Sequence, residues 1–139
     1  MTDKARKDAI SLIRQYYERF NSGDIEGFLS LLTEDVIHDL SQGPRETGKP
    51  AFRKFLEHMN RCYQERVRDL VVMVDETGRR AAAEFQLDGK YIATDGDLPP
   101  ARGQTYVLTV GAFFEIRNGK VARISNTYNF KDWLRQVQG

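Results

Sequence analysis

Cysteine and histidine are scarce in this chain of 139 residues, which has one cysteine, Cys62, and two histidines, His38 and His58. One thiol permits no internal disulfide and no cysteine-cluster metal site. Two imidazoles argue against a histidine-rich metal site. The sequence also has no glycine-rich phosphate loop after a predicted strand and no serine nucleophile elbow. We therefore expect a protein that uses neither a metal nor a cofactor.

The sequence lacks an excess of one charge and any long apolar run. Lysine and arginine number 21 and aspartate and glutamate 20, so the formal net charge of +1 argues against a dedicated nucleic-acid binder. The longest nearly apolar stretch, residues 106–114, is far shorter than the roughly 20 residues that span a bilayer. The N-terminus, MTDKARKDAI, is charged from its third residue and has no apolar signal core. These absences predict a cytoplasmic protein without nucleic-acid or membrane partners.

Hydrophobic residues, in contrast, are plentiful. They make up 40% of the chain, and aromatic residues make up 11%, which is enough for a packed core. A chain of this length fits one domain of ordinary size and leaves no room for a second core. We find no repeat, low-complexity tract or linker, and we predict a single domain over residues 1–139.

Helical periodicity dominates the first half of the chain. Apolar residues at helical spacing predict a helix over about residues 3–21, which the Asn21-Ser22-Gly23 sequence ends. Asp24 is placed to cap a short second helix. Pro50 suits the first turn of a third helix. The buried face of that third helix is predicted to contain Phe52, Phe55, Leu56, Met59 and Tyr63.

The second half has the pattern of strands. A short strand over residues 36–40 precedes the third helix, and four strands follow it. Asp88-Gly89 predicts a bulge or bend, and Asn118-Gly119 predicts a tight type I′ hairpin. A terminal helix closes the chain. The four later strands are predicted over residues 67–74, 81–94, 104–117 and 120–129.

This order of elements predicts an α+β fold with a mostly antiparallel sheet. Three helices in the first half cannot cover both faces of such a sheet evenly, so we expect them on its concave face. A curved sheet around helices leaves a pocket at its open end, which is a common place for a small-molecule site.

Asp39 is the first candidate for chemistry because it ends the short strand. If the face that it shares with Ile37 points into the pocket, desolvation raises the pKa of its carboxyl toward the range of a general base. The alternative is a solvated residue at a strand end. By the parity of the strand, His38 points away from Asp39.

Tyr16 and the last strand supply further polar candidates. Tyr16 lies on the inward stripe of the first helix, where its hydroxyl can serve a substrate carbonyl or simply meet a core partner. Ile124, Asn126 and Tyr128 share one face of the last strand. If this face points into the pocket, the Asn126 amide needs a partner, either a ligand or a neighbouring core group.

These residues resemble a known family. The runs YYERFNSGDIEGFLSLLTEDVIHDL and GPRETGKPAFRKFLEHM are similar to the opening of ketosteroid isomerases and SnoaL-like polyketide cyclases, which have the nuclear-transport-factor-2-like cone fold. The later run YIATDGDLPPARGQTYVLTVGAFFEIRNGKVARISNTYNFKDWLRQV resembles the subgroup called ketosteroid-isomerase-related proteins. The resemblance implies a cone-shaped, cystatin-like sheet wrapped around the three helices.

The resemblance also implies roles for individual residues. Tyr16, eight positions before Asp24, matches the oxyanion-hole tyrosine, and Asp39 matches the general base. The second oxyanion donor, an acid in the family, falls on or near Ala112, where no acid is present. Substrate-contacting residues are expected to be Asn126, Tyr128, Ile124, Ala112, Phe55 and Met59.

The function implied is a cofactor-independent isomerase, with Asp39 as base and Tyr16 as oxyanion donor on a small apolar ketone. A SnoaL-like polyketide cyclase, which needs the same base, is one alternative. A non-catalytic domain that binds hydrophobic ligands is the other, because the second acid is absent. The resemblance further implies a homodimer through the outer face of the sheet.

Overall fold

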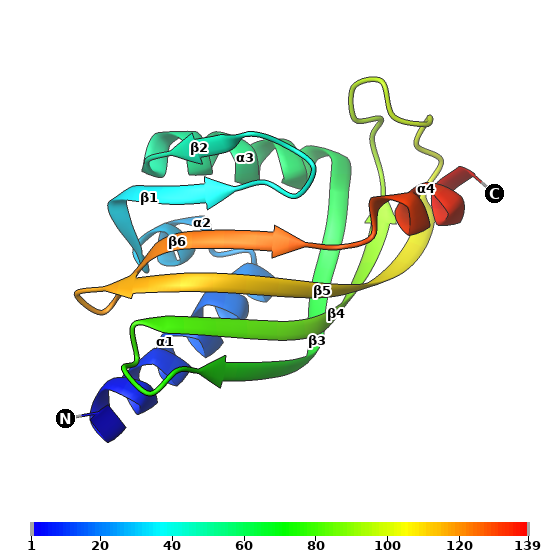
Figure 1. Ribbon diagram of the computed structural model, residues 1–139. Helices are drawn as coiled ribbons and strands as arrows, with labels where there is room; N and C mark the ends of the chain where they lie inside the picture. The colour runs from blue at the N-terminus through cyan, green and yellow to red at the C-terminus, as the bar shows by residue number, and fades with distance from the viewer. Residues whose placement is uncertain (1, 139) are drawn as a thin grey trace.

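The computed structural model describes residues 2–138, which form one six-stranded curved sheet with helices against its concave face (Figure 1). The strand order is β2-β1-β6-β5-β4-β3, and all neighbours are antiparallel except β1 and β6. The elements are α1 (Thr2–Ser22), α2 (Ile25–Leu29), β1 (Leu32–Asp39), β2 (Arg45–Thr47), α3 (Lys49–Cys62), β3 (Tyr63–Val74), β4 (Arg80–Tyr91), β5 (Gln104–Arg117), β6 (Lys120–Thr127) and α4 (Phe130–Gln138).

Local sequence chemistry sets the ends of the helices. Asp24 is the N-cap of α2, and its carboxylate accepts the backbone N–H of Gly27 at 2.9 Å. Pro50 lies in the first turn of α3, where its missing N–H is not needed. Both predictions, the Asp24 cap and Pro50 in the first turn, are confirmed. The predicted helix at the C-terminus is also confirmed, as α4.

The side chain of Asn21 ties the end of α1 to the sheet. Its amide nitrogen donates to the carbonyl of Val67 at 2.9 Å, and its oxygen accepts the N–H of the same residue at 2.8 Å. The Asn21 amide therefore pairs with both the N–H and the carbonyl of Val67, as the backbone of a neighbouring strand would. These two hydrogen bonds fix the helix across the concave face.

The strands differ from expectation at their ends and in two further places: β1 begins at Leu32, and β3 begins at Tyr63, a residue predicted to lie on the third helix. A short strand, β2, lies within the stretch expected to be only a turn, and it pairs with the end of β1. The sequence predicted a bulge or bend at Asp88-Gly89, and no bulge is present there, because β4 keeps a continuous register with both neighbours. The irregularity lies in β3, between Arg68 and Val71, where Asp69 adopts a φ of 56°. The tight hairpin at Asn118-Gly119 is confirmed, with φ values of 53° and 74°.

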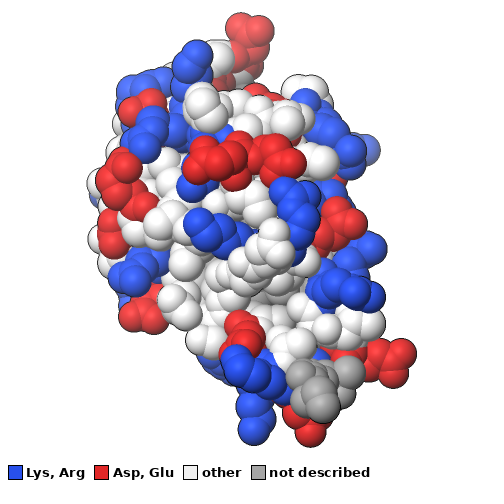
Figure 2. All heavy atoms as spheres, turned by 90° about the vertical axis from the view of Figure 1, so that its left-hand side faces the viewer, with Lys and Arg blue, Asp and Glu red and all other residues white. Residues whose placement is uncertain are grey.

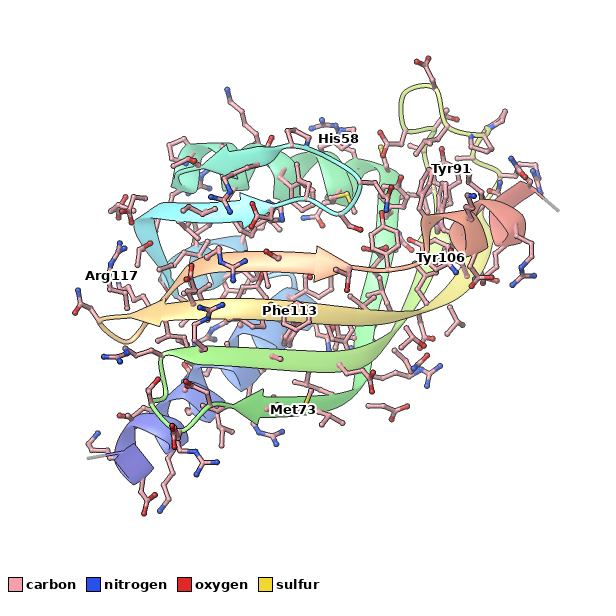
Figure 3. The ribbon with its side chains drawn as sticks, in the orientation of Figure 1. His58, Met73, Tyr91, Tyr106, Phe113 and Arg117 are labelled. Atoms are coloured by element: carbon pink, nitrogen blue, oxygen red, sulfur yellow. The ribbon has the colours of Figure 1, made fainter. Side chains whose placement is uncertain are left out.

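The core lies between the helices and the concave face, where aromatic rings from both layers meet. Tyr16 on α1 packs edge-on against Phe114 of β5 with ring centroids 5.3 Å apart. At the other end, Trp133 of α4 packs against Tyr91 and Tyr106, which Figure 3 places beside that helix. The terminal helix therefore closes one end of the curved sheet.

The surface carries mixed charge. Figure 2 shows lysine and arginine interspersed with aspartate and glutamate over one face, without a basic stripe. Within residues 2–138, no helix has the length and apolar character required to cross a membrane.

Candidate functional site

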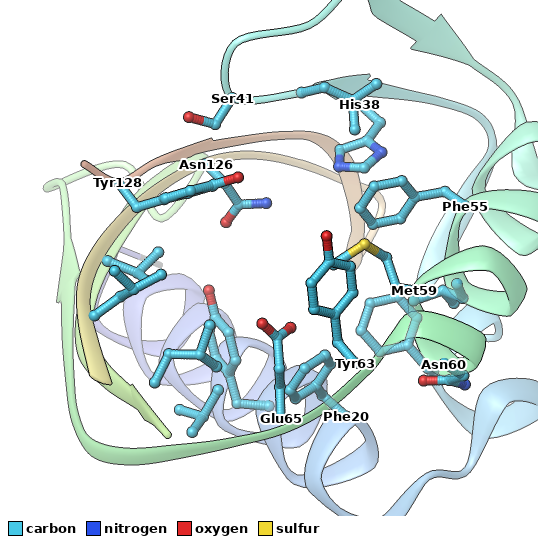
Figure 4. A pocket seen from close by; sticks show the side chains of 18 of the residues that line it. Phe20, His38, Ser41, Phe55, Met59, Asn60, Tyr63, Glu65, Asn126 and Tyr128 are labelled. Carbon is cyan, nitrogen blue, oxygen red and sulfur yellow. The ribbon is translucent and has the colours of Figure 1, made fainter. Parts of the chain in front are cut away.

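A cavity of about 310 Å³ lies between the concave face of the sheet and helices α1 and α3. Its wall is mainly apolar and aromatic, which suits a small apolar molecule. Figure 4 shows Glu65, Asn126 and Tyr128 pointing into the cavity. The aromatic side chains in its lining are Tyr16, Tyr17, Phe20, Phe28, Phe52, Phe55, Tyr63, Phe85, Tyr128, Phe130 and Trp133.

Glu65 is an acid whose carboxyl group points into this cavity. It lies on β3 between Tyr63 and Val67, and these three residues alternate onto the inner face of the sheet. Burial raises the pKa of the Glu65 carboxyl above its usual value, and a hydrogen bond from the Tyr106 hydroxyl opposes part of that rise. A carboxyl with a raised pKa can accept and return a proton near neutral pH.

The contact between Tyr106 and Glu65 depends on a glycine between them. Glu65, Gly89 and Tyr106 are paired across β3, β4 and β5 in one row of the sheet. The ring of Tyr106 lies over Gly89, so that a Cβ atom at residue 89 would come within 2.1 Å of the ring. Because that position has no side chain, the Tyr106 hydroxyl reaches across β4 and donates to the Glu65 carboxylate at 2.5 Å.

His38 faces the cavity from β1, contrary to the interpretation that placed Asp39 there. Its side chain is buried, with 2% of its surface exposed, and the imidazole stacks on Phe52 at 4.4 Å and 18°. Burial lowers the pKa of His38 to about 4, although the nearby Asp39 charge raises it slightly. The imidazole is therefore neutral at pH 7, and its Nδ1 atom has no hydrogen-bond partner among the described residues.

Asp39 lies on the outer face of the sheet, and the expectation that it faces the pocket is wrong. Its carboxylate accepts hydrogen bonds from Arg45 at 2.6 Å and Ser125 at 2.8 Å, and it pairs with Arg123 at 3.4 Å. Arg45, Ser125 and Arg123 hold the pKa of Asp39 down, at about 2, although its partial burial opposes them. A carboxylate held so firmly ionised by surface cations is a poor general base.

Tyr16 is buried and lines the cavity from α1, as expected. Burial raises the pKa of its phenol, so the hydroxyl stays protonated and can donate a hydrogen bond. Its neighbour Tyr17 also lines the cavity, and the Tyr17 hydroxyl has no hydrogen-bond partner among the described residues. Two phenols on one helix therefore border the same space.

The last strand faces inward as the sequence predicted, but only part of it reaches the cavity. Asn126 and Tyr128 line the cavity, whereas Ile124 is fully buried in the core and does not. Ala112, paired with Asn126 across β5 and β6, is also fully buried and absent from the lining. From α3, Phe55 and Met59 both line the cavity. Of the six expected contact residues, Ile124 and Ala112 therefore lie behind the cavity wall.

A second hydrogen-bonded group borders the cavity where the loop after β4 begins. The Tyr63 hydroxyl donates to Asp95 at 2.7 Å, and the other carboxylate oxygen of Asp95 lies 2.8 Å from Nε2 of His58. The N–H of Asp95 donates to the Tyr91 hydroxyl at 2.9 Å. These contacts hold the loop against α3 and β3 at the edge of the cavity.

Comparisons with known proteins agree with this geometry. A family model described as a SnoaL-like domain matches residues 13–124. A "putative polyketide cyclase" from Pseudomonas putida KT2440 is 56% identical, with a TM-score of 0.91 over 93% of this chain and 97% of that chain. A protein of the same description from Xanthomonas campestris pv. campestris is 50% identical, with a TM-score of 0.93 over 96% of this chain and 98% of that chain.

A more distant structure belongs to a "putative ketosteroid isomerase" from Kribbella flavida DSM 17836. It is 27% identical, with a TM-score of 0.65 over 89% of this chain and 79% of that chain. Among curated proteins, the sequence finds no match. The matching domain and the neighbouring structures confirm the nuclear-transport-factor-2-like α+β fold that the resemblance implied.

Proposed function

The chain belongs to the family of SnoaL-like domains, and we propose that it transfers a proton next to a carbonyl group of a small apolar substrate, with Glu65 as the base. The observation that carries this proposal is the Glu65 carboxyl inside an apolar cavity, with the Tyr106 hydroxyl as its hydrogen-bond donor. Glu65 takes the role that the sequence alone assigned to Asp39.

The steps of the proposed proton transfer follow from the side chains that line the cavity. The ionised Glu65 carboxylate removes a proton from the carbon beside the substrate carbonyl, leaving an enolate. Tyr16 donates a hydrogen bond from its hydroxyl group to the enolate oxygen, which stabilises the developing charge in a site of low polarity. In a substrate with a β,γ-double bond this enolate is a dienolate, and protonated Glu65 returns the proton to its γ-carbon, so that the double bond moves next to the carbonyl. The reaction balances without an oxidant, a reductant or a cofactor.

With Glu65 as the base, the same enolate can also close a ring. If the enolate carbon attacks a second carbonyl of the same molecule, the new alkoxide takes the proton from Glu65, and the result is an aldol cyclisation. The 56% and 50% identity to the two proteins named for polyketide cyclisation favours this second candidate. We therefore propose testing both cyclic enones and linear polyketide esters as substrates.

The test compares Glu65→Gln with Asp39→Asn, which removes the acid on the outer face. Proton abstraction is followed by NMR as exchange of the substrate's α-hydrogen for deuterium, together with product formation. A general base contributes roughly 10²–10⁴-fold, so Glu65→Gln is expected to lower the rate at least 100-fold, while Asp39→Asn keeps most of it. Thermal melting of both variants checks that they fold.

The reverse result, with turnover lost in Asp39→Asn and kept in Glu65→Gln, overturns the assignment. Tyr16→Phe provides a further check, since loss of one oxyanion donor lowers kcat by roughly 10²–10³-fold. Tight binding of apolar ketones without exchange in the unaltered protein would leave only the ligand-binding alternative.

We also propose that the protein forms a homodimer through the outer face of the sheet. Met73 on β3 and Phe113 on β5 are each 50% exposed, and Ala82 lies between them in the same row (Figure 3). Covering such an apolar row stabilises an interface. Light scattering on the eluted protein at about 10 µM is expected to give a dimer, which Phe113→Glu converts to a monomer. Ile92→Glu, at an exposed residue that follows β4, is the control, and a monomeric parent protein would contradict the proposal.

A further inference from the structure

Three potential metal ligands meet where α3 ends and the loop after β4 begins. His58 and Cys62 are four residues apart on α3, so both point from the same side of the helix. Asp95 comes from the loop. One donor atom from each residue, an imidazole nitrogen, the sulfur and a carboxylate oxygen, lies within 4.8 Å of the other two. Figure 3 shows the position of His58 on the helix.

The backbone holds these two segments together independently of the three side chains. The N–H groups of Ile92 and Ala93 donate to the carbonyl of Cys62 at 2.8 and 3.3 Å. The Cys62 sulfur lies 4.0 Å from the carbonyl of Thr94 and therefore points toward the loop. Because main-chain bonds fix the loop against the helix end, the three donors stay close together without a metal.

Each of the three donor types is one that binds zinc in proteins. Zn²⁺ binds imidazole nitrogen at about 2.0 Å, thiolate sulfur at about 2.3 Å and carboxylate oxygen at about 2.0 Å, usually with four ligands. Nε2 of His58 and the nearer oxygen of Asp95 are 2.8 Å apart, a spacing that two ligands of one ion can have after small side-chain shifts. Three protein ligands leave the fourth position for water.

A residue outside the three ligands supports the geometry. The second carboxylate oxygen of Asp95 accepts a hydrogen bond from Tyr63 at 2.7 Å. Such a bond to a ligating carboxylate orients it toward the ion, and its loss typically weakens metal binding 10–100-fold. Tyr63 and Asp95 also line the cavity, so the ion would lie at the cavity edge.

We propose that His58, Cys62 and Asp95 form a binding site for one zinc ion, with an open fourth position beside the cavity. Bound zinc replaces the hydrogen bond between His58 and Asp95 and links the loop to α3 through the metal. None of the three residues takes part in the proposed proton transfer. The zinc site can therefore be confirmed or refuted independently of that function.

The experiment titrates the full-length protein, kept reduced, with Zn²⁺ by calorimetry and with Co²⁺ by absorption. We expect one ion per chain and a sulfur-to-cobalt charge-transfer band. His58→Gln, Cys62→Ser and Asp95→Asn should each weaken Zn²⁺ binding at least tenfold, and Cys62→Ser should abolish the band. Tyr63→Phe is expected to weaken binding roughly tenfold. Asp97→Asn, an exposed acid of the same loop, should change nothing.

Several results overturn the proposal. These are no saturable Zn²⁺ binding, a cobalt spectrum without the sulfur band, or an affinity unchanged in His58→Gln. Circular dichroism checks the fold of each variant first. Cys62 is buried, and the Cys62→Ser variant can fail to fold. In that case the zinc site is tested by thermal melting of His58→Gln, which changes a partly exposed residue. Zn²⁺ must then raise the Tm of the unaltered protein and of Asp97→Asn, but not that of His58→Gln.

Discussion

Burial of the His38 imidazole links the stability of the fold to pH. The pKa of His38 falls from its ordinary value of 6.5 to about 4, because burial disfavours the charged form. Between these values the unfolded chain binds a proton at residue 38 and the folded protein does not. Stability is therefore complete above about pH 6.5 and falls as the pH drops toward 4.

The size of this effect follows from the two pKa values. Each pKa unit corresponds to about 1.4 kcal/mol, so lowering the pH from about 7.5 to about 4 costs about 3 kcal/mol at this one side chain. The Glu65 carboxyl opposes this loss, because its raised pKa makes stability increase with acid. Protonating Asp39 removes stability only at lower pH, as the pH falls from 3.8 toward its folded pKa of about 2.

A His38→Phe variant isolates the contribution of the imidazole. Phenylalanine keeps a flat ring against Phe52 and Phe55 and cannot be protonated. We expect the free energy of unfolding, measured by urea denaturation, to fall by about 3 kcal/mol more in the parent protein than in His38→Phe over this pH range. Parallel pH profiles for the two proteins would refute the reasoning, since Asp39 and Glu65 are the same in both.

Two further substitutions test the elements that position the site. Gly89→Ala should push the Tyr106 ring off β4 and break its bond to Glu65, lowering any Glu65-dependent exchange rate; an unchanged rate and an unchanged pH profile would contradict this. Asn21→Ala removes both hydrogen bonds to Val67 and leaves the backbone groups of Val67 without partners. Urea denaturation should show a loss of about 1–3 kcal/mol, and a loss well below that would mean that water replaces the amide.

The two acids illustrate why the candidate base could not be chosen from the sequence. Asp39 was favoured because it ends a strand next to apolar residues, yet both faces of that strand carry apolar side chains. Its true partners include Ser125 and Arg123, more than 80 residues away along the chain. These partners draw its carboxylate to the outer face and leave His38 inside.

The sequence carries only a weak signal for Glu65. It lies in the charged stretch QERVRD, which is typical of a solvated surface. Its alternation with Tyr63 and Val67 nevertheless places it on the inner face. Only the register of three strands shows that Gly89 and Tyr106 stand beside it, and register depends on contacts between distant segments.

Local features could be predicted from the sequence: the helix that Asp24 caps, the helix with Pro50 in its first turn, the hairpin at Asn118-Gly119 and the α+β order of elements. These depend on dihedral preferences and hydrogen bonds within a few residues. Tertiary structure alone decided which face of β1 points inward and which acid enters the cavity. It also brought Asp95 to His58 and Cys62. The reason is physical, since burial and the pairing of charges are fixed only when segments far apart in the chain come together.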